Sequence, residues 1–481
     1  MRLQVVLRYI GVVLLIFAGF MLVSSGIAWV SGPDSSFYPL LLSAMLTALL
    51  GAFPLIFVQR QEQINSKEGY CIVVGSWLIA CIVAMFPYLI WGGEFTLINA
   101  WFESVSGLTT TGASILTNIE ALPRGLLFWR MSTSWVGGIG VVLFALLVLP
   151  SMGRSKRMLS SVEISSVAKD DFHCRTQSMI QIILTVYIGI TIVTTLLLKF
   201  SGMNWFDSLA HAMSASSTCG FSTKNLSIAH FNSPLIEGVL IVAMFFAGTH
   251  FGLIYTTITG KRGNIWRSEV SRSVIFFILF GALAIALSLW ADNIYPTFWS
   301  SLRYSLFQFT SLVTTTGFAT ADTNIWTSFS IIILIFGSIV CACAGSTSGG
   351  IKFNRLLLAA KMLSSRLKRQ QHPNAIIRVR IDGVIQEDET VHTVMVFIVT
   401  YLMFILFGTL FNTLFGNDLT TGFTSAVACI GNVGPGFGDV GSMCNYATQP
   451  IILKFSNSLL MLFGRLEIFG LVQLFFIKWW R

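Results

Sequence analysis

Residues 109–114 read TTTGAS, a polar turn with one glycine that lies between two apolar stretches of the chain. Three further turns of this kind follow at intervals of about 100 residues, a period that is typical of internal repetition. They read STCGFS at residues 217–222, TTTGFA at residues 314–319 and GNVGPG at residues 431–436. Four similar turns predict four pseudo-symmetric units within a single chain.

A short amphipathic stretch of about 12 residues precedes each turn, and it is too short to cross a bilayer. We predict that it forms a re-entrant half-helix that ends near the middle of the membrane. The negative ends of four such helix dipoles would favour a cation between them. Counting back from the four glycines by the same number of positions predicts that these helices start at Asn99, Asp207, Tyr304 and Thr421, three of which are good N-cap residues.

The turns themselves carry the chemistry that a dehydrated cation needs. An extended Thr-x-Gly backbone presents successive carbonyl oxygens, and glycine lets the strands approach one another without a Cβ atom. Four copies therefore predict rings of carbonyl ligands, which is a selectivity filter. The predicted ligands are Thr110, Thr111, Gly112, Thr218, Cys219, Gly220, Thr315, Thr316, Gly317, Asn432, Val433 and Gly434. Residues nine positions before the glycines are expected to support the half-helices: Glu103, His211, Gln308 and Ser425.

The composition indicates a membrane protein, because 54% of the residues are hydrophobic and 11% are charged. Apolar stretches such as Leu40–Val58 and Ile72–Trp91 are long enough to span, and we expect about ten spans in all. The first apolar run, Tyr9–Val30, lacks the cleavage pattern of a signal peptide. We expect an all-α integral membrane protein around a central pore. Its predicted parts are an N-terminal helix pair at residues 1–66 and four units of span, pore helix, filter and span at residues 67–176, 177–268, 269–390 and 391–481.

The net charge of +9 is distributed as in an oriented membrane protein and does not indicate nucleic-acid binding. By the positive-inside rule, the basic loops and both termini are predicted to be cytoplasmic. Those loops hold the clusters Arg154–Arg157, Lys169–Arg175, Lys261–Arg272 and Lys352–Arg380. The eight cysteines have no zinc-site or disulfide spacing and are expected to be packing residues. The sequence shows no catalytic constellation, so neither an enzyme nor a bound cofactor is expected.

The succession of span, pore helix, filter and span resembles the Trk/Ktr/HKT superfamily of potassium transporters over nearly the whole chain. The supporting motifs are SGLTTTG (106–112), WVGGIG (135–140), CGFST (219–223), GSTSGGIK (345–352), NVGPG (432–436) and GRLE (464–467). The extra N-terminal helix pair resembles the TrkH branch and not the shorter KtrB branch. The resemblance implies potassium uptake across the bacterial inner membrane, because all four turns have glycine at the key position. It also implies a homodimer with a TrkA-like cytoplasmic subunit that binds nucleotides.

Two further features take their expected roles from this resemblance. The run Gly345, Ser346, Thr347, Ser348, Gly349 and Gly350 interrupts an apolar span and is expected to be an intramembrane gate loop beneath the filter; a kink for close helix packing is the alternative. Arg465 lies in an apolar run, where a lipid-facing charge would cost about 2.5–3.5 kcal/mol. It is expected to be a cationic barrier in the pore, and an ion pair with Glu467 or another acid is the alternative.

Other functions stay open at the level of the sequence. A sodium-permeable channel or a sodium-coupled symporter of the same superfamily would share these motifs. An alternating-access carrier would place its substrate at broken helices, and repeats of parallel topology argue against it. A purely structural membrane component is the third alternative. The cytoplasmic segment Ser364–Thr390 mixes charges of both signs, which suits either the docking of a soluble regulator or a solvated connector.

Overall fold

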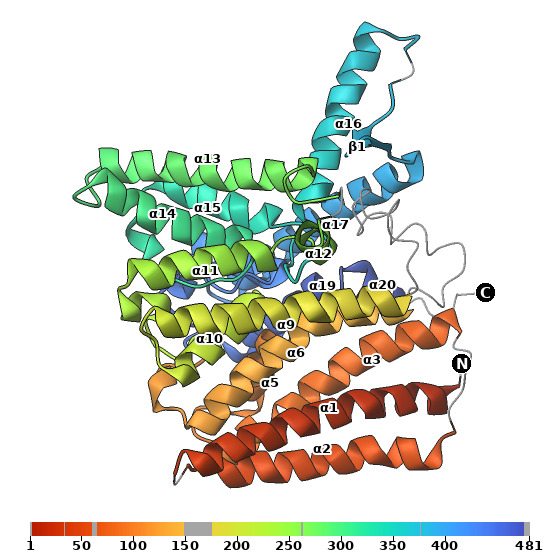
Figure 1. Ribbon diagram of the computed structural model, residues 1–481, viewed down its shortest axis with the longest axis vertical. Helices are drawn as coiled ribbons and strands as arrows, with labels where there is room; N and C mark the ends of the chain where they lie inside the picture. Colours follow the sequence, from red (N-terminus) through yellow and green to blue (C-terminus); the bar gives the residue numbers. More distant parts are fainter. Residues whose placement is uncertain are drawn as a thin grey trace.

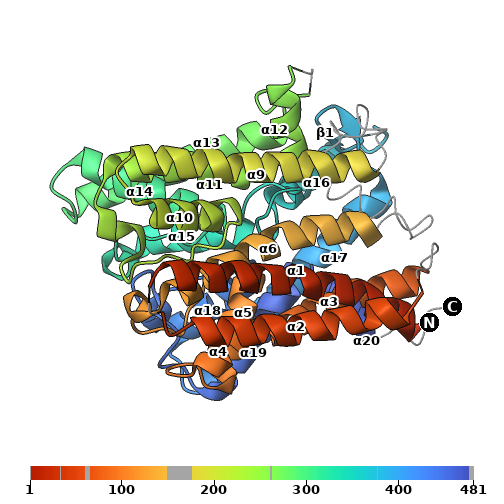
Figure 2. The ribbon, with the colours of Figure 1, turned by 60° about the horizontal axis from the view of Figure 1, so that its bottom comes forward.

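The computed structural model describes residues 2–32, 34–59, 65–148, 176–260, 263–375 and 377–475. The basic clusters Arg154–Arg157 and Lys169–Arg175 lie outside these residues. Long helices run side by side across the molecule, and α9 lies between α13 and the α1–α2 pair (Figure 1). The start of α1, helix α20 and the hairpin β1–β2 lie at one end of these helices, and the α1–α2 turn lies at the opposite end (Figures 1 and 2).

The first two helices, α1 (Leu3–Val30) and α2 (Phe37–Phe57), form an antiparallel pair. Their backbones meet at two glycines, because a Cβ atom on Gly11 would lie 2.6 Å from the carbonyl oxygen of Gly51. At the turn between them, Asp34 accepts a hydrogen bond from the backbone N–H of Gly125, at 3.0 Å. At the other end Arg2 pairs with Glu68, with 2.9 Å between Nε and Oε1. The pair is therefore attached to the first unit at both ends.

The remaining helices follow one order four times: a long helix, a short helix, a turn and a closing segment. In the first unit the long helix is in two parts, and in the other three units the closing segment is in two parts. The elements are α3 (Ser66–Ala84), α4 (Phe86–Trp91), α5 (Leu97–Leu108) and α6 (Arg124–Val148); α9 (Thr176–Phe200), α10 (Trp205–Ser216), α11 (Pro234–Ala247) and α12 (Phe251–Ile258); α13 (Glu269–Ala291), α14 (Phe298–Val313), α15 (Ser328–Val340) and α16 (Phe353–Gln371); and α17 (Asp388–Leu414), α18 (Leu419–Gly431), α19 (Ile451–Arg465) and α20 (Phe469–Phe475). The 3₁₀ turns Ile119–Ala121, Ser227–Phe231, Thr323–Ile325 and Gly438–Val440 follow the short helices α5, α10, α14 and α18.

The predicted starts of the short helices are wrong by about one turn. In α5, α10 and α18 the N-caps are Thr96, Asn204 and Asp418, and their side chains accept from the backbone N–H of Asn99, Asp207 and Thr421. The residues predicted as caps thus occupy the N3 position, whose backbone N–H donates to the side chain of the actual cap. Helix α14 starts one turn earlier still, at the capping box of Thr297 and Ser300, so that Tyr304 lies inside it.

Fewer helices than expected are long enough to span. In the described part of the chain, six helices have the length and hydropathy of a membrane span, where the sequence predicts about ten. Three of the four closing segments are broken, and the fourth, α6, is 25 residues long but is not among the six. Helices α11 and α12 meet at an angle of 105°, α15 ends at Val340 before the glycine-rich run, and α19 ends at Arg465 before the short α20. Helix breaks of this kind are tolerated inside a membrane only where protein or a water-filled path covers them.

The long segment between α16 and α17 contains a small β-hairpin that the sequence did not predict. Strands β1 (Arg380–Ile381) and β2 (Val384–Ile385) pair in antiparallel register. Asp382 at the turn accepts from the backbone N–H of Glu269 at 2.5 Å, at the start of α13. Helix α16 extends away from the helix bundle, and the hairpin lies near its base (Figure 1).

The apolar core connects the units. One cluster packs α1, α2 and α3 against α5, α6 and α19, so the last unit closes onto the first. A second cluster joins α13, α14 and α15 with the start of α17. This closure brings the four turns together.

Candidate ion-binding site

The four turns share one backbone conformation. The residue two positions before each glycine is in the left-handed region, with φ of 53° at Thr110, 55° at Thr218, 58° at Thr315 and 53° at Asn432. The glycines follow at φ of 81°, 83°, 78° and 97°. Left-handed threonine is rare, because its Cβ atom crowds the following carbonyl. Three threonines and one asparagine in this conformation at equivalent positions show that the four turns share one backbone geometry.

Hydrogen bonds from the ends of the short helices hold this conformation. In the first turn, the N–H of Thr111 donates to Ser106 O at 2.9 Å, and the N–H of Thr110 donates to Gly107 O at 3.0 Å. This is the Schellman arrangement of a helix C-terminus. The matching bond from the residue before the glycine recurs in the other turns, Cys219 to Ser214 at 3.0 Å, Thr316 to Ser311 at 2.8 Å and Val433 to Ala428 at 2.9 Å.

The glycines place the turns in a closed ring. A Cβ atom on Gly112 would lie 1.8 Å from the carbonyl oxygen of Cys219 in the second turn. The corresponding distances are 1.9 Å from Gly220 to Thr316 O, 2.2 Å from Gly317 to Val433 O and 2.5 Å from Gly434 to Thr111 O. Each glycine therefore packs against the carbonyl that precedes the glycine of the next turn, and the fourth turn closes on the first. Any side chain in these positions would occupy the space of an oxygen.

The side chains of the residues before the glycines point into the protein. Cys219 and Val433 are fully buried and belong to apolar clusters. The hydroxyl of Thr111 is 2.8 Å from that of Thr109 and accepts from Asn432 Nδ2 at 3.0 Å. The hydroxyl of Thr316 is 2.8 Å from that of Thr314. At these four positions, the backbone oxygens are therefore the groups that remain for a ligand in the ring.

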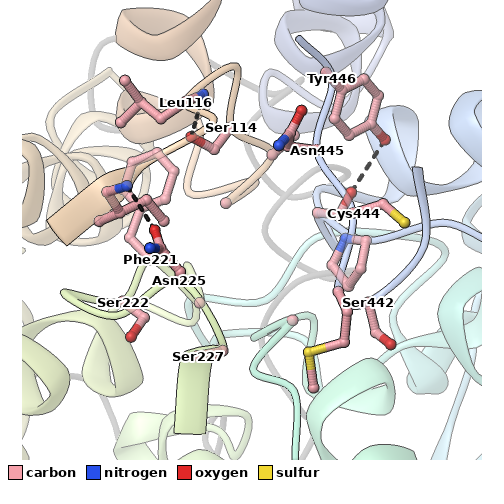
Figure 3. Close-up of a pocket in the computed structure, with 18 of the residues that line it drawn as sticks. Ser114, Leu116, Phe221, Ser222, Asn225, Ser227, Ser442, Cys444, Asn445 and Tyr446 are labelled. Atoms are coloured by element: carbon pink, nitrogen blue, oxygen red, sulfur yellow. Dashed lines mark hydrogen bonds between the residues drawn. The ribbon is translucent and has the colours of Figure 1, made fainter. Parts of the chain in front are cut away.

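The chain beyond each glycine forms a second closed ring of hydrogen bonds. These bonds run from Ile119 N–H to Asn225 Oδ1 at 2.7 Å, from Ile228 N–H to Ala319 O at 3.1 Å, from Thr323 N–H to Ser442 Oγ at 3.1 Å and from Tyr446 N–H to Ser114 O at 2.8 Å. The same segments surround a cavity of about 210 Å³, and all four glycines line it. Figure 3 shows Ser114, Phe221, Ser442 and Tyr446 around its opening. The cavity leads to the ring of glycines.

The supporting residues expected behind the filter hold the segments after the glycines in three units. Glu103 accepts from Ser114 Oγ at 3.0 Å, His211 Nε2 lies 2.9 Å from Ser222 Oγ, and Gln308 donates to Ala321 O at 2.8 Å. In the fourth unit Ser425 instead accepts from Asn457 on α19 at 3.0 Å, and Thr424 bonds Phe437 beyond the glycine.

The run from Gly345 to Gly350 lies against the inner ends of the turns. Thr347 Oγ1 lies 3.3 Å from Thr218 Oγ1 and donates to Ser216 O at 3.2 Å. The N–H of Gly349 donates to Thr315 Oγ1 at 3.2 Å. Ser346, Thr347 and Ser348 are almost fully buried. The loop thus contacts the second and third turns on the side opposite to the cavity.

Arg465 is buried beside this loop and does not form the ion pair with Glu467 that was the alternative. Its guanidinium donates to Thr347 O at 2.5 Å and to Gly137 O at 3.1 Å, so it joins the loop to α6. Glu467 instead binds Lys352 and, at 2.8 Å, Arg355. Helix α19 ends before Glu467, which has φ of 54°, and its carboxylate lies at the start of α16. Arg465 has no ion pair with any described residue.

Comparison with known proteins assigns the family. The profile of TrkH, described as a cation transport protein, matches residues 40–289 and 298–479. The chain belongs to the TrkH family. The Trk system potassium uptake protein TrkH of Salmonella typhimurium is 31% identical over 488 residues, with all of both chains covered. TrkG of Escherichia coli is 31% identical over 422 residues, covering 87% of this chain and 86% of TrkG. The crystal structure of the potassium transporter TrkH from Vibrio parahaemolyticus superimposes with a TM-score of 0.90 at 28% identity over both whole chains.

Membership of the TrkH family confirms the family resemblance and the all-α membrane fold predicted from the sequence. The chain is a helical, multi-span membrane protein of a transport family. The glycine-rich run of α6 packs closely against α5, since a Cβ atom on Gly137 would lie 2.0 Å from Leu108 O. The individual roles of filter, gate loop and Arg465 remain proposals.

Two features beside the ring were not predicted. The first is Arg130, which lies in the apolar stretch of α6 and pairs with Glu103. The sequence could have indicated this pair, because the two residues carry opposite charges within apolar segments. The second is the break between α11 and α12. There Phe251 N–H donates to Gly345 O at 3.2 Å and Cys343 N–H donates to Gly248 O at 3.0 Å. Gly248, Thr249 and His250 in an otherwise apolar run could have indicated it.

Proposed function

We propose that this chain conducts potassium ions into the cell across the bacterial inner membrane, through the ring formed by its four turns. The observation that carries the proposal is the cyclic packing of each glycine against a carbonyl of the next turn. Carbonyl oxygens can replace the hydration shell of a monovalent cation, and four helix C-termini add negative partial charge around them. The predicted ligands are the backbone oxygens of the twelve residues of the turns, from Thr110–Gly112 to Asn432–Gly434.

Selectivity for potassium is supported by two independent features. All four turns have glycine at the key position, and in the superfamily that the chain resembles a serine at this position of the first turn goes with sodium permeation. The relatives from Salmonella typhimurium and Escherichia coli are named potassium uptake proteins. We therefore propose transport of potassium, with no catalytic role and no bound cofactor.

The contacts on the inner side support a gate. The loop of residues 345–350 lies directly against the turns, and Arg465 holds it to α6 through carbonyl oxygens. We propose that a cation can pass only when this loop moves. The sequence pattern adds the proposals of four repeats with the boundaries given above and, by the positive-inside rule, cytoplasmic termini. The resemblance to the superfamily adds a homodimer and a TrkA-like nucleotide-binding subunit that controls the loop.

The experiment is uptake of potassium, rubidium and sodium in cells that lack their own potassium systems, with the full chain expressed. Potassium and rubidium should enter much faster than sodium and restore growth at low potassium. Sodium entry at an equal rate would contradict the proposal and favour a sodium-permeable protein. Potassium entry that depends strictly on external sodium would indicate a coupled symporter.

A further inference from the structure

A buried ion pair joins the first and second turns, and no other turn has an equivalent in the described residues. Arg130 Nε lies 2.6 Å from Glu103 Oε1, and the two side chains are 1% and 0% exposed. At the same position relative to the glycine, the other units have His211, Gln308 and Ser425. The pair therefore breaks the fourfold pattern at one place.

Each partner holds the chain just beyond one glycine. The carboxylate of Glu103 accepts from Ser114 Oγ at 3.0 Å and from Ile115 N–H at 3.0 Å, so it fixes the chain after Gly112. Arg130 Nη1 donates to Ser222 O at 3.1 Å, two residues after Gly220. Its guanidinium also lies 3.5 Å from the centre of the Phe221 ring. One side chain thus connects both turns.

The ion pair lies behind the contact between the first and second turns, which is the closest contact in the ring. The distance of 1.8 Å from the Cβ position of Gly112 to Cys219 O is the smallest of the four. A filter discriminates between cations through the number and placement of its carbonyl ligands. A rigid charge-assisted contact behind two neighbouring turns restricts how far their oxygens can move inward around a smaller ion.

We propose that Arg130 is a positioning residue for ion selectivity, and that its pair with Glu103 fixes the separation of the first two turns against collapse around sodium. This inference rests on the proposed potassium pathway. Arg130 does not bind the ion, since its guanidinium is a cation itself and is occupied by Glu103, Ser222 and Phe221.

The test replaces the planar, branched guanidinium with an ammonium that keeps the charge. Arg130→Lys retains a cation beside Glu103, so no buried carboxylate is left without a partner, but one nitrogen cannot reach Glu103 and Ser222 O in the same geometry. The matched control is Arg303→Lys. Arg303 likewise pairs with a buried glutamate, through two hydrogen bonds of 2.7 Å to Glu237 on α11, but it lies near the start of α14, far along the helix from the turn.

Rubidium and sodium uptake are measured per amount of monodisperse protein in vesicles. Arg130→Lys should lower the ratio of rubidium to sodium uptake by about tenfold, which corresponds to about 1.4 kcal/mol. Arg303→Lys should leave the ratio unchanged. An unchanged ratio in Arg130→Lys, or an equal fall in both variants, would overturn the inference. If the unmodified protein fails to discriminate between the two ions, the proposed function fails first and the inference falls with it.

Discussion

Gly112→Ser should lower the ratio of potassium to sodium uptake by about tenfold or more, while folded protein is still obtained. The serine Cβ would lie 1.8 Å from Cys219 O, so the second turn must shift and its carbonyl must leave the ring. The backbone adds a further cost, because φ at Gly112 is 81° and a non-glycine residue there is strained by about 1–3 kcal/mol. Uptake of both ions is measured with the amount of inserted protein.

The controls for this prediction are two glycines with similar backbone but open surroundings. Gly202 and Gly416 have φ of 105° and 107°, and a Cβ atom on either would meet nothing within 4 Å. Each of these two glycines lies just before a short helix, whereas the filter glycines lie after the short helices. Gly202→Ser and Gly416→Ser should lose stability from the same backbone strain and keep the ion ratio. Gly434→Ser should have a milder effect than Gly112→Ser, since its distance to Thr111 O is 2.5 Å. A folded Gly112→Ser protein with unchanged selectivity would contradict the filter.

Arg465→Ala should raise the maximal rate of rubidium uptake by about tenfold, with a smaller effect on apparent affinity. A positive charge 4 Å from a passing cation raises its energy by about 4 kcal/mol at an effective dielectric of 20, and water and carbonyls reduce this figure. The substitution also removes the bonds to Thr347 O and Gly137 O that hold the loop. The protein should still fold, because the lost partners are carbonyls and no described carboxylate is left unpaired, unlike the loss of one half of a buried ion pair.

Two variants separate the causes. Arg465→Lys keeps the charge and loses the fork of the guanidinium, so a rate near that of the unmodified protein shows that charge is the barrier. A rate as high as that of Arg465→Ala would show instead that the loop contact matters. Lys454 is a second buried cation in α19, and its ammonium donates to Asn99 and Ala447. Lys454→Ala is therefore the control variant and should leave the rate unchanged. Unchanged or lower flux in folded Arg465→Ala protein would exclude the barrier.

The sequence predicted the four short helices and their turns, and it missed the β-hairpin and the Arg130–Glu103 pair. Four turns at similar spacing identify the short helices and their order. Any single turn could be an ordinary loop, but four at one spacing indicate a repeated unit. The N-caps were misplaced because Asn99, Asp207 and Thr421 are themselves good caps by residue type. The three-residue shift depends on Thr96, Asn204 and Asp418, whose side chains accept from the backbone N–H groups of those three residues.

The details of the site depended on contacts between distant segments. The sequence places Glu103 behind the first turn, but only the fold brings Arg130 beside it and the carbonyl of Ser222 within reach of the pair. The partner of Arg465 was likewise undecided from the sequence, because Glu467 is only two residues away and an ion pair between them was possible. The backbone of the turn after α19 decides that Glu467 contacts α16 instead.

The most direct measurement is the location of rubidium in crystals of this protein by anomalous diffraction. The ions should lie on the axis between Gly112, Gly220, Gly317 and Gly434, within ligand distance of the carbonyls of Thr111, Cys219, Thr316 and Val433. Replacing rubidium with sodium should remove this density. Rubidium bound only elsewhere, for example at the break between α11 and α12, would contradict a carbonyl filter and favour a carrier with its site at broken helices.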